Sequence, residues 1–222
     1  MFRRLGVFVG GFSLDLALEV VPTSTKDEDH WLVINGLGVL VDRSFVAVDS
    51  ADPPRYRMLE PIRIFAAEQL ADTAEIDAVR SQHARAIRKR YTTVYERRMY
   101  DFDDAVHTMK VDLGNADAAM QWALLNDPET ALALMPPLRS AVGSSAMTPL
   151  NIWSITESFL SDAIPVAIRA TWALASCKAM PLDWHRSVKW VKVALRLFRE
   201  SGDMDGVQEA LFQLIGSKCA AR

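Results

Sequence analysis

Residues 55–70 read RYRMLEPIRIFAAEQL and join a short alternating stretch directly to a helical one. In RYRML, polar and apolar side chains alternate, which is the period of a half-buried strand. From Ile62 onward, apolar side chains recur every three to four residues, as in an amphipathic helix. We expect Leu59, Ile62 and Phe65 to anchor this helix to the core beside it.

The residues upstream predict three helices followed by a hairpin. Apolar positions at helical spacing run through residues 2–9, 14–21 and 31–41, and Ser13 is placed to cap the second helix. The stretch SFVAVD then leads through the breaker-rich SADPP into RYRML, which is a hairpin signature with prolines at its tip. Three short helices and a hairpin are the elements of a winged helix, which we predict for residues 1–75.

Beyond residue 75 the strand pattern stops and helical patterns follow one another. They cover residues 76–99, 116–125, 129–142, 151–163, 166–179, 183–200 and 205–215. The connections are short, so neighbouring helices must stack to bury their apolar faces. We therefore predict a mainly α fold in which a tetratricopeptide-like array of antiparallel helices, residues 76–222, follows the winged helix. A plain helical bundle is the alternative.

Composition excludes several classes of protein. The 222 residues carry a net charge of −3, whereas dedicated nucleic-acid binders usually show a large basic excess. Two cysteines cannot form a disulfide framework and fit a reducing cytoplasm. No stretch approaches the roughly 18 apolar residues that span a bilayer, so we expect no membrane partner.

The sequence offers no catalytic, cofactor-binding or metal-binding set. The phosphate-binding pattern G-x-x-x-x-G-K-[ST] is absent, so nucleotide hydrolysis by this chain is not expected. The four histidines are dispersed without metal-ligand spacing. The acidic cluster Asp101, Asp103 and Asp104 fits a helix cap better than a pair of hydrolytic carboxylates. We therefore expect a protein without enzymatic activity and without a cofactor.

A winged helix raises the alternative of DNA binding. The third predicted helix offers Asn35 and Arg43 to base edges, and the hairpin adds Arg55 and Arg57. However, residues 1–70 hold seven Lys and Arg against ten Asp and Glu, and a negative surface does not steer a protein toward a polyanion. The sequence therefore favours a protein-interaction role over direct DNA reading.

Two later segments are weaker candidates for binding. Arginines and Lys89 in residues 80–98 form a basic helix surface, which is more often a solvated face than a binding site. In the array, Trp184, Lys189 and Trp190 are candidates for contact with a partner. Large aromatic side chains at helical spacing are, however, more often core than ligand cage.

Five phrases along the chain carry a family resemblance: FRRLGVFVGGFSL, LVDRSFVAVD, RYRMLEPIRIFAAEQL, NADAAMQWAL and ALRLFRESGD. In this order they resemble the middle of bacterial STAND-class signal-transduction ATPases and transcriptional regulators. The resemblance implies that the winged helix transmits changes between a nucleotide-binding domain and a sensor array. It implies a protein or small-molecule inducer on the array, and a neighbouring nucleotide-binding domain in a longer parent protein. Because the phosphate loop is missing, we expect the chain to be a fragment of such a parent.

Overall fold

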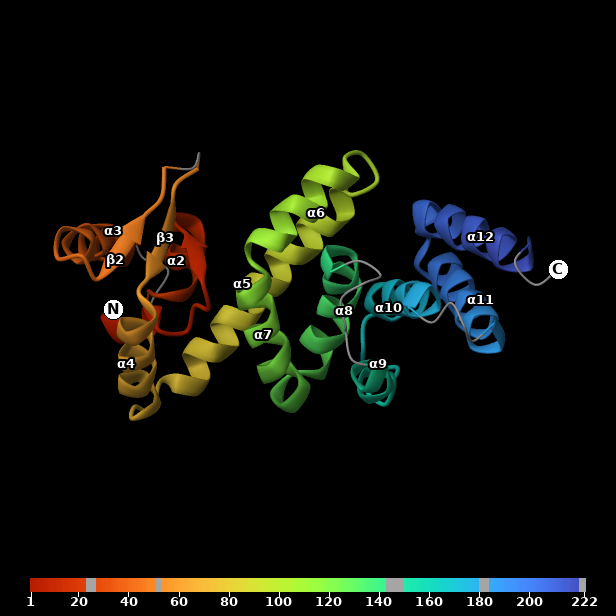
Figure 1. Ribbon diagram of the computed structural model, residues 1–222. Coiled ribbons are helices and arrows are strands. Elements are labelled where there is room, and N and C mark those ends of the chain that lie inside the picture. The colour runs from red at the N-terminus through yellow and green to blue at the C-terminus, as the bar shows by residue number, and fades with distance from the viewer. Residues whose placement is uncertain (23–26, 51–52, 143–149, 180–183, 220–222) are drawn as a thin grey trace. The chain divides into compact units, whose positions relative to one another are not determined.

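The computed structural model describes residues 1–22, 27–50, 53–142, 150–179 and 184–219 (Figure 1). Its contacts group into two compact units. The first contains Met1–Arg90 and Lys110–Trp122, and the second contains Tyr91–Met109 and Ala123–Arg222. Both units are largely helical, so the predicted mainly α fold is confirmed.

The first unit contains a three-stranded antiparallel sheet. Its strands are β1 (Gly11–Ser13), β2 (Val46–Val48) and β3 (Arg55–Met58), in the order β1-β3-β2. The central Tyr56 pairs with Phe12 on one side and with Val48 on the other. The predicted hairpin is therefore confirmed as β2 and β3. Strand β1 was not predicted, because three residues beginning with a glycine show no periodicity.

Four helices surround this sheet: α1 (Phe2–Leu5), α2 (Leu14–Val20), α3 (Asp27–Asp42) and α4 (Glu60–Ala71). Ser13 caps α2 as expected, since its hydroxyl accepts a hydrogen bond of 3.2 Å from the Leu16 amide. The three helices α1 to α3, the β2–β3 hairpin and α4 reproduce the predicted winged helix.

The first unit's core differs from the expectation on α4. Leu59 and Phe65, expected to anchor this helix, are about half exposed, and Ile62 is only half-buried; Ala66 and Leu70 are the buried residues. Helix α1 causes the difference. A Cβ added at Gly6 would lie 2.4 Å from the Ala67 amide nitrogen, so only small side chains fit where the two helices meet. The larger apolar residues are left outside this close contact, where Phe65 meets the Phe2 ring of α1 at 6.4 Å and stays about half exposed.

Three helices contribute residues to both units. These are α5 (Ile76–Arg97), α6 (Phe102–Val111) and α7 (Leu113–Asn126). Helix α6 was not predicted. The cap interpretation of the acidic cluster is confirmed for Asp101, whose carboxylate accepts a 3.0 Å hydrogen bond from the Asp104 amide at the start of α6.

The second unit also contains α8 (Pro128–Val142), α9 (Leu150–Glu157), α10 (Val166–Ala179), α11 (Trp184–Ser201) and α12 (Met204–Cys219). Helix α10 packs against both α8 and α11, and α11 packs against α12. Tryptophans fill the centre: the ring of Trp172 lies 5.6 Å from that of Trp153 and 4.9 Å from that of Trp190. The Trp172 indole donates a 3.1 Å hydrogen bond to the Thr156 hydroxyl, so its polar atom is satisfied inside the core.

Candidate nucleic-acid interface

The exposed face of α3 combines polar and apolar side chains. Val33 and Leu37 face the core, whereas Trp31, Asn35, Val39 and Arg43 are exposed and follow one another at four-residue spacing. The Arg43 amide still donates to the Val39 carbonyl at 3.1 Å, so Arg43 continues the helical path at its end. Asn35 and Arg43 are thus on one face, beside a tryptophan that is 64% exposed.

The two arginines of β3 have different surroundings. Arg57 is exposed. Arg55 is half-buried, and its guanidinium donates to the Gly11 carbonyl at 3.0 Å and to the Asp112 carboxylate at 2.5 Å. Contact between Arg55 and a phosphate would require this buried ion pair to break.

Asp112 and Asn115 hold the residues around β1 in place. Asp112 is 1% exposed, and its second carboxylate oxygen lies 2.7 Å from Arg90 Nε, in ion-pair contact without the alignment of a hydrogen bond. The Asn115 side chain accepts a 2.8 Å hydrogen bond from the Val9 amide and donates a 2.9 Å bond to the Gly11 carbonyl. Residues from α7 and the turn before it therefore support the winged helix.

Sequence reasoning missed the role of both residues. Their hydrogen-bond partners lie 57 to 106 positions away in the chain, and even Arg90, the second ion-pair partner of Asp112, precedes it by more than five helical turns, so no local pattern marks them. The only available signal was a polar pair, Asp112 and Asn115, beside the apolar run of a helix.

His83 on α5 lies beside this network. Its ring meets the Phe8 ring edge-on at 5.5 Å. Burial lowers the pKa of His83 to about 4, and Asn115 and Asp112 only partly oppose this change. His83 is therefore neutral at physiological pH and belongs to the core of the first unit.

Part of the basic surface predicted in residues 80–98 is paired within the units. Lys89 lies 2.6 Å from Glu19, and Arg90 contacts Asp112. In the second unit, Arg98 lies 2.6 Å from Glu209. These pairs reduce the positive charge that α5 offers to an external polyanion.

Of the candidate residues of the array whose side chains are described, the one aromatic residue is not exposed. Trp190 is buried against Trp172, while the exposed Lys189 places its ammonium 5.1 Å from the Trp190 ring. Trp184 begins α11, but its side chain lies outside the described residues.

Cys177 is a buried thiol in the array. Burial raises its pKa to about 11, which makes it unreactive. Across the parts of the chain that the structure describes, no three His, Cys, Asp or Glu residues gather into a metal-binding group. None of the described helices is long and apolar enough to cross a bilayer.

The comparisons with known proteins agree with the N-terminal fold. Residues 1–71 match the family described as a winged helix-turn-helix domain. Two proteins, one from Mycobacterium tuberculosis and one from Mycobacterium bovis, are each 32% identical over 226 residues. Both are named "Putative HTH-type transcriptional regulator". The match covers 95% of this chain and 25% of each relative, so the chain spans about a quarter of their length.

A shorter match involves a Mycobacterium tuberculosis protein named only as uncharacterized. It is 32% identical over 90 residues, which is 40% of this chain and 23% of that protein. No solved structure matches the chain significantly.

Proposed function

We propose that this chain is a non-catalytic part of an HTH-type transcriptional regulator and that its winged helix contacts DNA. The match of residues 1–71 to the winged helix-turn-helix family carries the proposal, together with the similarity to regulators over 95% of the chain. The exposed Asn35, Arg43 and Arg57 are the side chains that would meet the DNA. This reverses the order favoured by charge alone, which placed protein interaction first.

The finer parts of the proposal rest on the resemblance to STAND-class regulators. We place the winged-helix domain at residues 1–75 and a tetratricopeptide-like array at residues 76–222. The array would receive a protein or small-molecule inducer, and a nucleotide-binding domain of a longer cytoplasmic parent would respond to the change. The stacked helices α10, α11 and α12 are compatible with such an array.

A second candidate function is protein docking by the winged helix. Trp31, Leu32 and Val39 expose large apolar side chains on α3, where a DNA-reading helix usually presents polar ones. Arg55 is held by Asp112, and residues 1–70 are net negative. These three observations favour a protein partner for the same face.

DNA binding by the full chain tests the first proposal. We expect a mixed-sequence duplex of about 30 base pairs to bind at low salt, with an affinity that falls by roughly 0.9 logarithmic units per phosphate contact as salt rises tenfold. The triple variant N35A/R43A/R57A should weaken binding by at least about tenfold, the effect of ~1.4 kcal/mol. Arg55 is left unchanged, because its replacement would disturb the buried pair with Asp112.

The matched control is R85A, which removes an exposed arginine of the first unit outside α3 and the wing. It should leave the affinity within about twofold, since distant exposed charges are screened. No binding at low salt, or equal losses in the triple variant and the control, would refute DNA contact by this face. If the chain instead associates with the nucleotide-binding domain of its parent protein and W31S abolishes this association, protein docking replaces DNA contact as the function of this face.

A further inference from the structure

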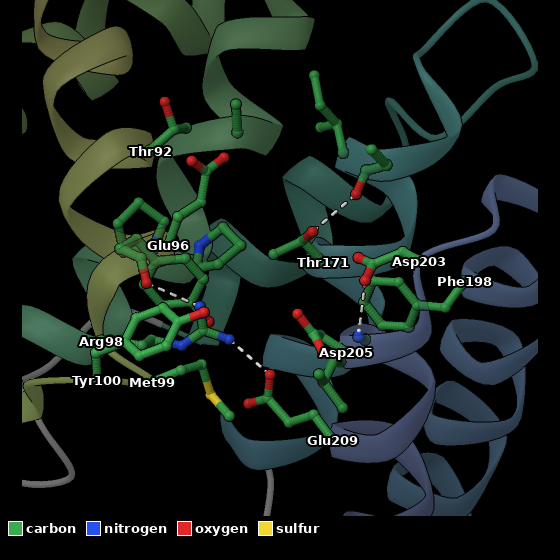
Figure 2. Close-up of a pocket in the computed structure, with 18 residues that line it drawn as sticks. Thr92, Glu96, Arg98, Met99, Tyr100, Thr171, Phe198, Asp203, Asp205 and Glu209 are labelled. Carbon is green, nitrogen blue, oxygen red and sulfur yellow. Dashed lines mark hydrogen bonds and ion pairs between the residues drawn. The ribbon is translucent and has the colours of Figure 1, made fainter.

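The second unit contains a cavity of about 520 Å³ among helices α5, α8, α10, α11 and α12. All of its lining residues belong to this unit. The volume falls in the range of sites for small organic ligands, roughly 300–1,000 Å³. Figure 2 shows side chains from several helices converging on this space.

The cavity has an apolar floor and an exposed apolar rim. Buried Pro136, Leu174 and Phe198 line the floor. At the rim, Met99 is largely exposed and Tyr100 is 90% exposed, so an aromatic ring and a thioether stand at the opening with little to cover them. Such a lining favours a ligand with a hydrophobic body.

The charged groups of the cavity are mostly acidic. Glu96 lies on α5, and Asp203, Asp205 and Glu209 come from α12 and the turn before it (Figure 2). Among the described lining residues, Arg98 is the one cation. Glu209 pairs with it, with 2.6 Å between Arg98 Nη2 and the carboxylate, and the other carboxylate oxygen pairs with Lys178, which is outside the lining. The remaining three carboxylates leave the cavity net negative.

Helix α8 lacks part of its backbone hydrogen bonding where it lines the cavity. Helix α8 contains Pro136 and Pro137, and neither residue has an N–H group. The Ala133 carbonyl would ordinarily accept from one of these two positions, three or four residues further on. Ala133 lines the cavity. Its carbonyl therefore lacks both of its usual helical donors.

Arg98 shows how this cavity holds a cationic group. Its guanidinium lies over the Tyr95 ring, 3.6 Å from the centroid, and contacts Glu209 at the edge. A flat or compact cation held between an aromatic face and a carboxylate is a favourable arrangement. Among the described lining residues there is no second cation to pair with Glu96, Asp203 or Asp205.

We propose that this cavity binds a small organic cation, an amine or guanidinium attached to an apolar body. The apolar body would lie on the floor formed by α8, α10 and Phe198, and the cationic group would meet one of the exposed carboxylates of the lining, Asp205 or Glu96. A regulatory role for the bound ligand rests on the proposed function of the chain. The binding itself depends only on the second unit. Its test therefore omits DNA, so that either proposal can fail without the other.

The probe is 4-phenylbutylamine, with uncharged 4-phenylbutan-1-ol as the matched control for its apolar body. Both are titrated into the isotopically labelled full chain and followed by amide chemical shifts. We expect the amine to shift Thr171, Leu174 and Gly206, and to bind at least about tenfold more tightly than the alcohol, a difference of the size of one charged hydrogen bond.

Two variants separate the site from general charge attraction. E96Q/D205N removes two exposed carboxylates and should weaken amine binding by about tenfold or more. E200Q removes an exposed carboxylate of α11 outside the lining and should change the affinity for the amine less than twofold. A167W places a large ring at an exposed lining position and should block both probes without unfolding the chain.

The proposal fails under any of three results. The first is the absence of amine-specific shifts at about 10 mM, a concentration that detects fragment-sized ligands. The second is equal binding of the amine and the alcohol. The third is amine binding that persists in both E96Q/D205N and A167W, because that binding would lie elsewhere on the chain.

Discussion

Replacing Asp112 with asparagine should destabilise the first unit more than any exposed charge substitution. Asp112 is 1% exposed and contacts both Arg55 and Arg90. Removing one partner of a buried ion pair costs about 3–5 kcal/mol when the remaining charge stays buried. Here the arginine side chains are 15% and 32% exposed and can turn toward water. We therefore expect a loss of about 2–3 kcal/mol, below the fully buried range.

Hydrogen exchange of the Val9 amide is the assay specific to this unit. Val9 donates to Asn115, three residues from Asp112, so its protection reports on the same support. A loss of about 2 kcal/mol corresponds to roughly 30-fold faster exchange. Urea unfolding of D112N should show the same free-energy change, read from the first transition if the two units unfold separately.

The matched control is D117N, which alters an exposed carboxylate on α7 that accepts a 2.8 Å hydrogen bond from Gln121. It should cost less than about 0.5 kcal/mol. A cycle of D112N, R55Q and the double variant should give a coupling energy of at least about 1 kcal/mol. Equal costs for D112N and D117N, or a coupling energy of zero, would show that the Asp112 contacts contribute nothing to stability.

Three further predictions concern stability. Because the folded-state pKa of His83, about 4, lies below the ordinary 6.5, the unfolded chain binds the proton first. The free energy of unfolding should therefore fall by up to about 3 kcal/mol between pH 6.5 and pH 4, and H83F should flatten this part of the curve. The Glu75 carboxyl, whose pKa Arg4 and Arg3 lower to about 2, titrates mostly below that window. G6A should cost at least about 2 kcal/mol in thermal unfolding, because its Cβ would meet the Ala67 backbone. G38A, inside α3 with open space around the added atom, should instead stabilise by about 0.5–1 kcal/mol; equal effects of the two alanines would contradict the proposed α1–α4 contact.

The elements that sequence predicted are those whose signals are local. The β2–β3 hairpin, α4 and the helices α8 to α12 each show their period within a dozen residues. Strand β1 depends on pairing with β3, more than 40 positions later, and its own three residues show no period. Helix α6 does show the helical period, at Phe102, Ala105, Val106 and Met109, so it could have been predicted and was missed because the acidic cluster beside it was interpreted only as a cap.

The candidate sites were predicted less completely, because they depend on contacts between distant residues. The winged-helix pattern was enough to select Asn35, Arg43 and Arg57 as candidates, and all three are exposed. The ion pair between Arg55 and Asp112 could not be predicted from sequence, since the two residues lie 57 positions apart. The error at Phe65 has the same origin: periodicity defines a face of α4, but only the approach of Gly6 selects its alanines for burial.

The two hydrogen bonds of Asn115 also affect how the protein is made. They reach back 104 and 106 positions, to Gly11 and Val9. During translation the segment that contains Val9 and Gly11 leaves the ribosome long before this asparagine is added. Until then Phe8 and Phe12 belong to a domain whose packing is incomplete. Nascent chains that stall before this point should engage chaperones and proteases more readily than longer ones. An amino-terminal fragment cut at residue 75 would lack both of these hydrogen bonds.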